Sequence, residues 1–147
     1  MERETIARLH KNFEEYAHRE SDVEFWYARE LQILLGYDKW SNFEGVIERA
    51  KIACEKSKQR ISDHFADAGK MVDLGSGSNQ EIQDIMLTRY ACYLIAQNGD
   101  PRKDEVAFAM TQTKRFHMEV FYYIPFSSKN QKSYAFNTFI GQGLRRY

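Results

Sequence analysis

Residues 87–103 constrain the fold of this chain more than any other segment, because they hold a helix stop and a helix start a few residues apart. They read Leu-Thr-Arg-Tyr-Ala-Cys-Tyr-Leu-Ile-Ala-Gln-Asn-Gly-Asp-Pro-Arg-Lys. The hydroxyl of Thr88 can accept a hydrogen bond from an unpaired N–H group in the first turn of a helix that begins at Arg89. The residues that follow are apolar on nearly every side, which is typical of a buried helix.

Two dipeptides predict a corner after this helix. Asn98-Gly99 can supply the left-handed residue on which helices often end. Asp100-Pro101 predicts that a second helix starts at once, with Asp100 as its N-cap and Pro101 in the first helical position, where the missing N–H costs nothing. The run therefore predicts a buried helix, a tight corner and a second helix.

Five cations in two groups are candidates for binding an anion such as a phosphate. Arg102 and Lys103 would stand in the first turn of the second helix, where the macrodipole disfavours positive charge. Arg49, Lys56 and Arg60 are seven and four residues apart and would share one face of a long helix. A simpler interpretation of both groups is a solvated first turn and a solvated helix face.

Hydrophobic periodicity and capping signals predict the remaining elements. The first expected elements are an amphipathic helix over residues 5–18, a polar link over 19–22, an aromatic strand over 23–27 and a helix over 28–35 that ends at Gly36. A long helix follows, which the capping box Ser41-Asn42-Phe43-Glu44 opens and which runs to about Arg60. Two strands over 70–74 and 81–87, joined by a flexible Gly-Ser tip, complete the prediction.

Composition limits the class of protein. The chain has 147 residues, 43% of them hydrophobic and 29% charged, which fits one globular domain. No segment is apolar over the ~20 residues of a membrane span, and the charged start resembles no signal peptide, so we expect a cytoplasmic protein without a membrane partner. Cys54 and Cys92 lie in apolar contexts and are expected to be buried free thiols.

Charge is balanced overall but not along the chain. The formal net charge is zero, which argues against strong nonspecific nucleic-acid binding through bulk charge. Residues 1–87 carry a net charge of −5 and residues 88–147 a net charge of +5. This asymmetry fits an anionic partner, and it equally fits two parts of one fold that attract each other.

No catalytic or metal-binding constellation stands out. The four histidines are scattered, and there is no Cys-x-x-Cys pair. Asp63-His64 could form an acid–base pair, but a polar linker around it favours a solvated or locally hydrogen-bonded histidine. The Gly-Ser tip lacks the ending of a phosphate-binding loop. We therefore expect a protein that is not an enzyme and that holds neither a cofactor nor a metal.

The residue composition changes after about Thr111. Residues 118–126 and 134–140 are aromatic and β-prone, and residues 141–147 are basic and contain glycine. If exposed, residues 121–124 would be an aggregation hazard. They must therefore be covered, paired within the domain, or paired with another chain.

Three blocks carry a family likeness in their order and spacing. They are Trp-Tyr-Ala-Arg-Glu-Leu at 26–31 with Leu-Leu-Gly-Tyr at 34–37, Arg-Ala-Lys-Ile-Ala-Cys at 49–54 followed by Asp-His-Phe at 63–65, and the run at 87–103. Together they resemble the DNA-damage-inducible protein D family of bacteria, whose amino-terminal region is similar to the BRO-N domain of viral and phage proteins. The likeness covers roughly residues 23–109.

The resemblance implies an α+β fold, with helices packed on a small antiparallel sheet or β-hairpin. It also implies association with DNA and a role in the SOS response, as a modulator of recombinase filaments on single-stranded DNA. No catalytic residues carry over, because the family is not an established enzyme. We expect an amphipathic helical extension over residues 1–22, a BRO-N-like core domain over 23–115, and a divergent aromatic segment over 116–147.

Three hypotheses follow for the function. The first is a DNA-associated, non-enzymatic accessory protein of the SOS response that binds single- or double-stranded DNA. The second is a protein–protein interaction module that binds a recombinase or another repair partner without DNA contact, and the third is a phage-type antirepressor or transcription regulator. The terminal segments could also support a homo-oligomer. The candidate DNA contacts are Arg49, Lys56, Arg60, Arg89, Arg102 and Lys103.

Overall fold

The computed structural model describes residues 3–116. Five helices and a four-stranded sheet make up this part of the chain, so the expected α+β class is confirmed. In chain order the elements are α1 (Arg3–Glu15), β1 (His18–Glu20), β2 (Val23–Tyr27), α2 (Ala28–Leu34), α3 (Trp40–Lys56), a 3-10 turn η1 (Ile61–Asp63), β3 (Phe65–Asp73), β4 (Asn79–Leu87), α4 (Arg89–Gln97) and α5 (Asp104–Phe116).

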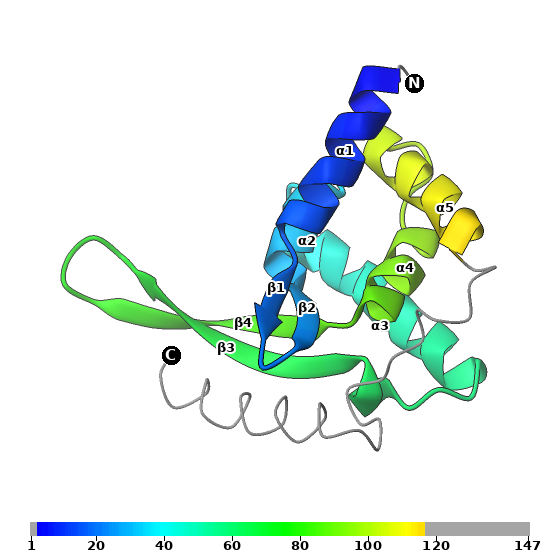
Figure 1. Ribbon diagram of the computed structural model, residues 1–147. Coiled ribbons are helices and arrows are strands. Elements are labelled where there is room, and N and C mark those ends of the chain that lie inside the picture. Colours follow the sequence, from blue (N-terminus) through cyan, green and yellow to red (C-terminus); the bar gives the residue numbers. More distant parts are fainter. Residues whose placement is uncertain (1–2, 117–147) are drawn as a thin grey trace.

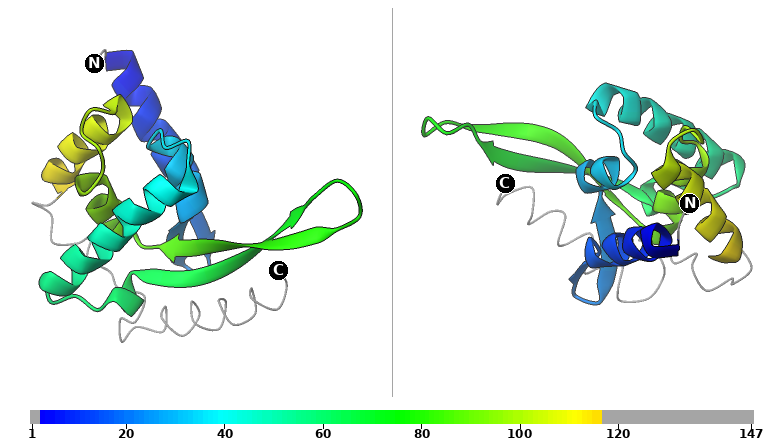
Figure 2. Two further views of the ribbon diagram at one scale, coloured as in Figure 1. Left: turned by 180° about the vertical axis from the view of Figure 1, so that it is seen from behind. Right: turned by 90° about the horizontal axis from the view of Figure 1, so that it is seen from above.

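The sheet is antiparallel throughout, with the strand order β1-β2-β4-β3. Strands β3 and β4 pair over their whole length, from Phe65 opposite Leu87 to Asp73 opposite Asn79. Only the end of this hairpin near Leu87 packs under the helices, and the rest projects away from them (Figure 1). In both views its tip lies on the opposite side of the molecule from the end of α3 (Figure 2).

The core lies between the base of the sheet and helices α2, α3 and α4. Trp26, Phe43, Ile47, Leu87 and Ile95 are all fully buried. Each such side chain contributes roughly 1.5–3 kcal/mol relative to an exposed position. These residues lie on the predicted apolar faces. The faces can be read from the sequence because side chains return to the same side every 3.6 residues in a helix and every 2 residues in a strand.

Several local predictions are confirmed. The Thr88 hydroxyl accepts a hydrogen bond from the N–H of Ala91 at 3.1 Å and caps α4. Gly36 follows α2 with a φ of +75°. Cys54 and Cys92 are buried free thiols. Short-range rules locate these features because each depends on a hydrogen bond or a backbone angle within a few residues.

The corner after α4 differs from the prediction in two ways. Gly99 does not adopt a left-handed conformation; a Cβ there would lie 2.9 Å from Val106 Cγ1, so close packing explains the glycine. Asp100-Pro101 does not start a helix, because the Asp100 carboxylate accepts a hydrogen bond from the N–H of Arg102 and closes a turn instead. Helix α5 begins at Asp104, beyond both corner cations.

The long helix α3 begins and ends earlier than predicted. Its N-cap is Lys39, which makes no side-chain capping bond, so Ser41 lies inside the helix and the predicted capping box is wrong. At the other end Lys58 has a φ of +61°, and the N–H of Gln59 donates to the carbonyl of Cys54. This left-handed residue ends the helix, so Arg60 does not share a helical face with Arg49.

The sheet is larger than the sequence predicted. The amino-terminal helix stops at Glu15, and residues 18–20 form β1, which pairs with β2 through a two-residue loop. Both loop residues, Ser21 and Asp22, have positive φ angles, as the tight hairpin turn requires. Strand β3 begins at Phe65 rather than residue 70. The expected strands at 118–126 and 134–140 lie outside the described residues, and the expected domain limits stay predictions.

Candidate nucleic-acid interface

Arg89 stands in the first turn of α4 and is enclosed by carboxylates from α1 and β2. Its guanidinium donates to both carboxylate oxygens of Glu14, at 2.6 and 2.9 Å, and to both of Glu24, at 2.7 and 3.2 Å. The side chain is 13% exposed and lies 4.9 Å from the centre of the Trp26 ring. We call Arg89, Glu14 and Glu24 the Arg89 network.

The groups around Arg89 stabilise its charged form. Burial disfavours the charge, but hydrogen bonds to Glu14, Glu24 and Tyr93 outweigh it and raise the pKa of Arg89. The network joins α4 to β2 and to α1, because Arg89 contacts Glu24 and Glu14, which lie 65 and 75 residues away in the chain. Its guanidinium is therefore a structural group, and we leave it out of the DNA contacts proposed below.

The other cation group predicted near residue 100 is present at the corner, which comprises residues 98–103. Arg49 reaches it from α3 and donates to the carbonyl of Asn98 at 3.0 Å. Lys103 donates to the carbonyl of Gly36 at 2.9 Å, and Arg102 pairs with Asp100 at 2.9 Å. The structure thus brings Arg49, Arg102 and Lys103 together, although each already has a partner.

The Asp100–Arg102 pair joins a partly buried carboxylate, 30% exposed, to a guanidinium that lies in solvent. Arg102 has 89% of its side chain exposed. Its hydrogen bonds to Asp100 lower the pKa of that carboxyl to about 2. Exposed pairs of this kind are weak, so a phosphate could compete with the carboxylate for the guanidinium.

A second group of cations lies where α3 ends. Lys56, Lys58 and Arg60 are all exposed, and we call them the basic turn. Within residues 3–116, none of their side chains has a hydrogen bond or an ion pair. Sequence reasoning missed Lys58 because it extended the helix through this point. The loss of apolar periodicity after Cys54 was the available signal.

The projecting hairpin has the opposite charge. Asp67, Asp73 and Glu81 are exposed on it, against one exposed cation, Lys70. A hairpin with this surface repels a phosphate backbone. The basic turn and the tip of the hairpin lie at opposite ends of the molecule (Figure 2).

Asp63 and His64 are buried, so their placement in a polar linker was wrong. The ring of His64 is fully buried, and its Nδ1 lies 2.8 Å from the Thr88 hydroxyl. Burial lowers its pKa to about 4, although the Asp63 carboxylate acts in the opposite direction. The contact with the helix cap shows that His64 is a packing residue beside α4.

Among the described residues, no three His, Cys, Asp or Glu side chains are grouped so that they could hold a metal ion. In the same part of the chain, no helix has the length and apolarity that crossing a membrane requires.

Comparisons with known proteins agree with the resemblance noted in the sequence. Residues 15–115 match the model of the BRO family, N-terminal domain. The chain is 47% identical over 97 residues to the DNA damage-inducible protein D of Escherichia coli K12, an alignment that covers 63% of this chain and 35% of the relative. The chain thus spans about a third of that relative's length. No solved structure matches it.

Proposed function

The chain belongs to the BRO family, whose N-terminal domain it carries, and on this premise we propose that it is a DNA-associated accessory protein of the bacterial DNA-damage response. In this role it is not an enzyme, works in the cytoplasm, and contacts the sugar-phosphate backbone through the basic turn. The relative is a DNA damage-inducible protein, and this name supports the biological setting.

The observation that carries this proposal is the unpaired state of the basic turn. Three exposed cations within five residues have no carboxylate partner among the described residues. Each phosphate that such a cation neutralises contributes a salt slope of about −0.7 for single-stranded or about −0.9 for double-stranded DNA. Three contacts therefore predict that affinity falls roughly 20- to 40-fold between 50 and 200 mM salt.

The corner is a weaker, second contact. Arg49, Arg102 and Lys103 must each exchange an existing partner for a phosphate. The hydrogen bonds lost in that exchange offset part of the gain. We therefore rank the basic turn above the corner as a DNA contact.

Fluorescence anisotropy of labelled single- and double-stranded oligonucleotides, at 50 and 200 mM salt, tests the proposal on the full chain. We expect Lys56→Gln/Lys58→Gln/Arg60→Gln to weaken binding at least tenfold. The matched control, Arg49→Gln/Arg102→Gln/Lys103→Gln, removes the same charge and should weaken binding about threefold. No binding by the wild type at low salt contradicts the proposal, and equal losses in both variants reduce it to a net-charge effect.

We further propose that the protein modulates recombinase filaments on single-stranded DNA. Its test is the rate of filament assembly on a single-stranded oligonucleotide, with and without the protein. An operator-specific footprint would instead favour the antirepressor alternative.

The acidic hairpin supports a second candidate, a module that binds a repair partner without touching DNA. Its three exposed carboxylates suit a basic protein surface better than a nucleic acid. Pull-down of a recombinase without DNA tests this candidate. Asp67→Asn/Asp73→Asn/Glu81→Gln should abolish recovery, and no recovery by the wild type at micromolar concentration counts against it.

A further inference from the structure

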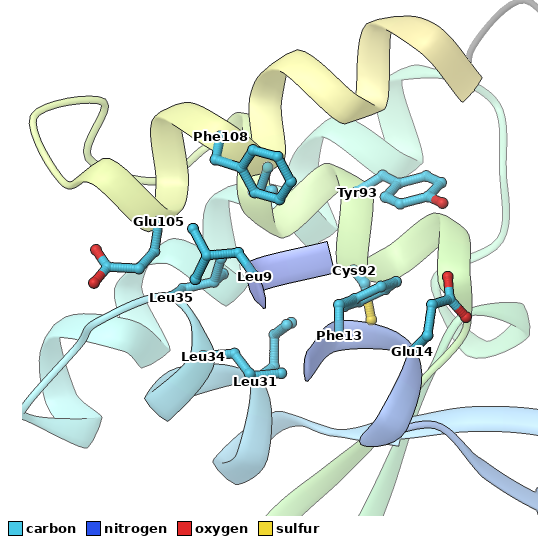
Figure 3. A pocket seen from close by; sticks show the side chains of 12 residues that line it. Leu9, Phe13, Glu14, Leu31, Leu34, Leu35, Cys92, Tyr93, Glu105 and Phe108 are labelled. Carbon is cyan, nitrogen blue, oxygen red and sulfur yellow. The ribbon is translucent and has the colours of Figure 1, made fainter. Parts of the chain in front are cut away.

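An apolar groove with a volume of about 60 Å³ opens between α1, α2, α4 and α5. Ten of its twelve lining residues are apolar, and Leu9, Phe13, Leu34 and Ala109 are only partly buried, so the groove reaches the surface. A single water needs about 15 Å³ of such space, and a closed cavity that binds benzene has about 150 Å³, so the groove admits part of an aromatic ring and leaves the rest outside its mouth. We call it the α1–α5 groove (Figure 3).

The sequence directly after α5 has the right chemistry to fill this groove. Residues 118–126 read Met-Glu-Val-Phe-Tyr-Tyr-Ile-Pro-Phe, with one charge in nine residues. Residues 117–147 contain eight Phe and Tyr residues. Because exposed aromatic segments of this kind aggregate, they require a cover.

Chain length permits the contact. Helix α5 ends at Phe116 and contributes Glu105, Phe108 and Ala109 to the groove. Of these lining residues, Glu105 is the farthest from the end of the helix. It lies eleven residues before Phe116, a distance of roughly 16 Å at 1.5 Å per residue. About five extended residues cover the same distance, so a chain that reverses after Phe116 brings residues 121–124 alongside the groove.

Charge favours the same arrangement. Residues 117–147 carry a net charge of +3, and the other 116 residues carry −3. Figure 3 places Glu105 and Glu14 at opposite ends of the groove, and Glu105 stands beside Asp104 in the first turn of α5. Lys129 and Lys132 follow the aromatic segment and can meet this acidic end.

We propose that residues 118–126 dock into the α1–α5 groove of their own chain and place part of one aromatic ring among Phe13, Leu34 and Phe108. The tether raises the effective concentration of the segment to the millimolar range, so even a weak contact is occupied. This inference does not rest on the proposed function, because the groove and the basic turn share no residue.

A photo-crosslinking experiment on the full chain tests the proposal. Tyr122 is replaced by p-benzoylphenylalanine, and the protein is irradiated at low micromolar concentration. We expect crosslinks within one chain to peptides of α1, α2 or α5. Crosslinks to the hairpin overturn the proposal, as does a covalent dimer that remains the main product after tenfold dilution, which would assign the groove to a second copy. The same replacement at Tyr147, fifteen residues beyond Lys132, is the control and should not label these helices.

Hydrogen exchange provides an independent measurement. Phe121→Ser/Ile124→Ser should speed exchange in α1 at least tenfold, with the β3–β4 hairpin unchanged as an internal reference. The matched variant Phe136→Ser/Phe139→Ser removes at least as much apolar surface from the second aromatic stretch and should leave α1 protected. Unchanged exchange in α1 for the first variant, or equal changes in both variants, overturns the proposal.

Discussion

The Arg89 network and the basic turn use positive charge in opposite ways. Arg89 is 13% exposed and holds two carboxylates, whereas Lys56, Lys58 and Arg60 are exposed and have no such partner among the described residues. The partners of Arg89 are 65 and 75 residues away in the chain. The availability of a cation for a ligand therefore depends on distant residues, which local sequence does not reveal.

The strongest test of this comparison is Arg89→Met. The change leaves Glu14 and Glu24 close together without their cation, and breaking a buried pair costs about 3–5 kcal/mol. Because Glu14 is partly exposed, we expect a loss near the lower limit, about 3 kcal/mol. Urea unfolding at pH 7 measures the free energy of unfolding.

The basic turn supplies the contrast for that measurement. Lys56→Gln/Lys58→Gln/Arg60→Gln changes three exposed side chains and should shift the free energy of unfolding by no more than about 0.5 kcal/mol for each. Adding Glu14→Gln/Glu24→Gln to Arg89→Met should recover part of the loss, because it removes the uncompensated carboxylates. A loss under 1 kcal/mol for Arg89→Met would show that the network is not a structural unit.

His64 extends the contrast between buried and exposed groups to pH, because its fully buried ring is titratable. Its folded pKa is about 4, below the ordinary 6.5, because burial disfavours the charged ring. The unfolded chain therefore binds a proton first, and the stability that the neutral ring contributes above pH 6.5 is lost as pH falls toward 4. Between pH 8 and pH 5 this loss is about 2 kcal/mol.

The pH effect is measured as a difference between two proteins. The free energies of unfolding of the wild type and of His64→Gln are determined from pH 8 to pH 5. The variant should lack most of the slope. Asp84 does not imitate the effect, because burial raises the pKa of its carboxyl and makes its contribution change in the opposite direction. Equal slopes in the two proteins would contradict the assignment to His64.

The sequence predicted those features of the fold that depend on neighbouring residues. The Thr88 cap, Gly36 and the apolar stripe of α3 rest on hydrogen bonds or spacings within a few positions. The sequence failed where two local signals compete. At Asp100, the same carboxylate can cap a helix or close a turn, and contacts of the corner with Tyr37 accompany the turn.

The candidate site was predictable only in part. Cation spacing identified Lys56 and Arg60, but it treated them as one helical face with Arg49 because the helix end at Lys58 was missed. Cation spacing also treated Arg89 and Arg102 alike, as candidate DNA contacts. In the structure, Arg89 is buried against partners distant in the chain, whereas Arg102 lies in solvent. No local pattern encodes such pairing, so the sorting of the six cations required the structure.

The smallest predicted effect concerns Lys58, the residue that joins stability and binding. Helices α2 and α3 end with the same pair of backbone bonds, and the left-handed position holds Gly36 in one and Lys58 in the other. A lysine in this conformation costs about 1 kcal/mol more than a glycine, and the greater freedom of glycine in the unfolded chain offsets part of that. Lys58→Gly should therefore raise the free energy of unfolding by roughly 0.5 kcal/mol.

The same substitution should weaken DNA binding, because it removes one phosphate contact and lowers the salt slope by about 1. Lys58→Ala is the matched control: it removes the same charge but keeps the left-handed strain, so it should lose the same affinity without the gain in stability. An unchanged slope in both variants would remove Lys58 from the interface. Opposite changes in stability and affinity for Lys58→Gly would mean that the fold retains a strained lysine here because binding requires its charge.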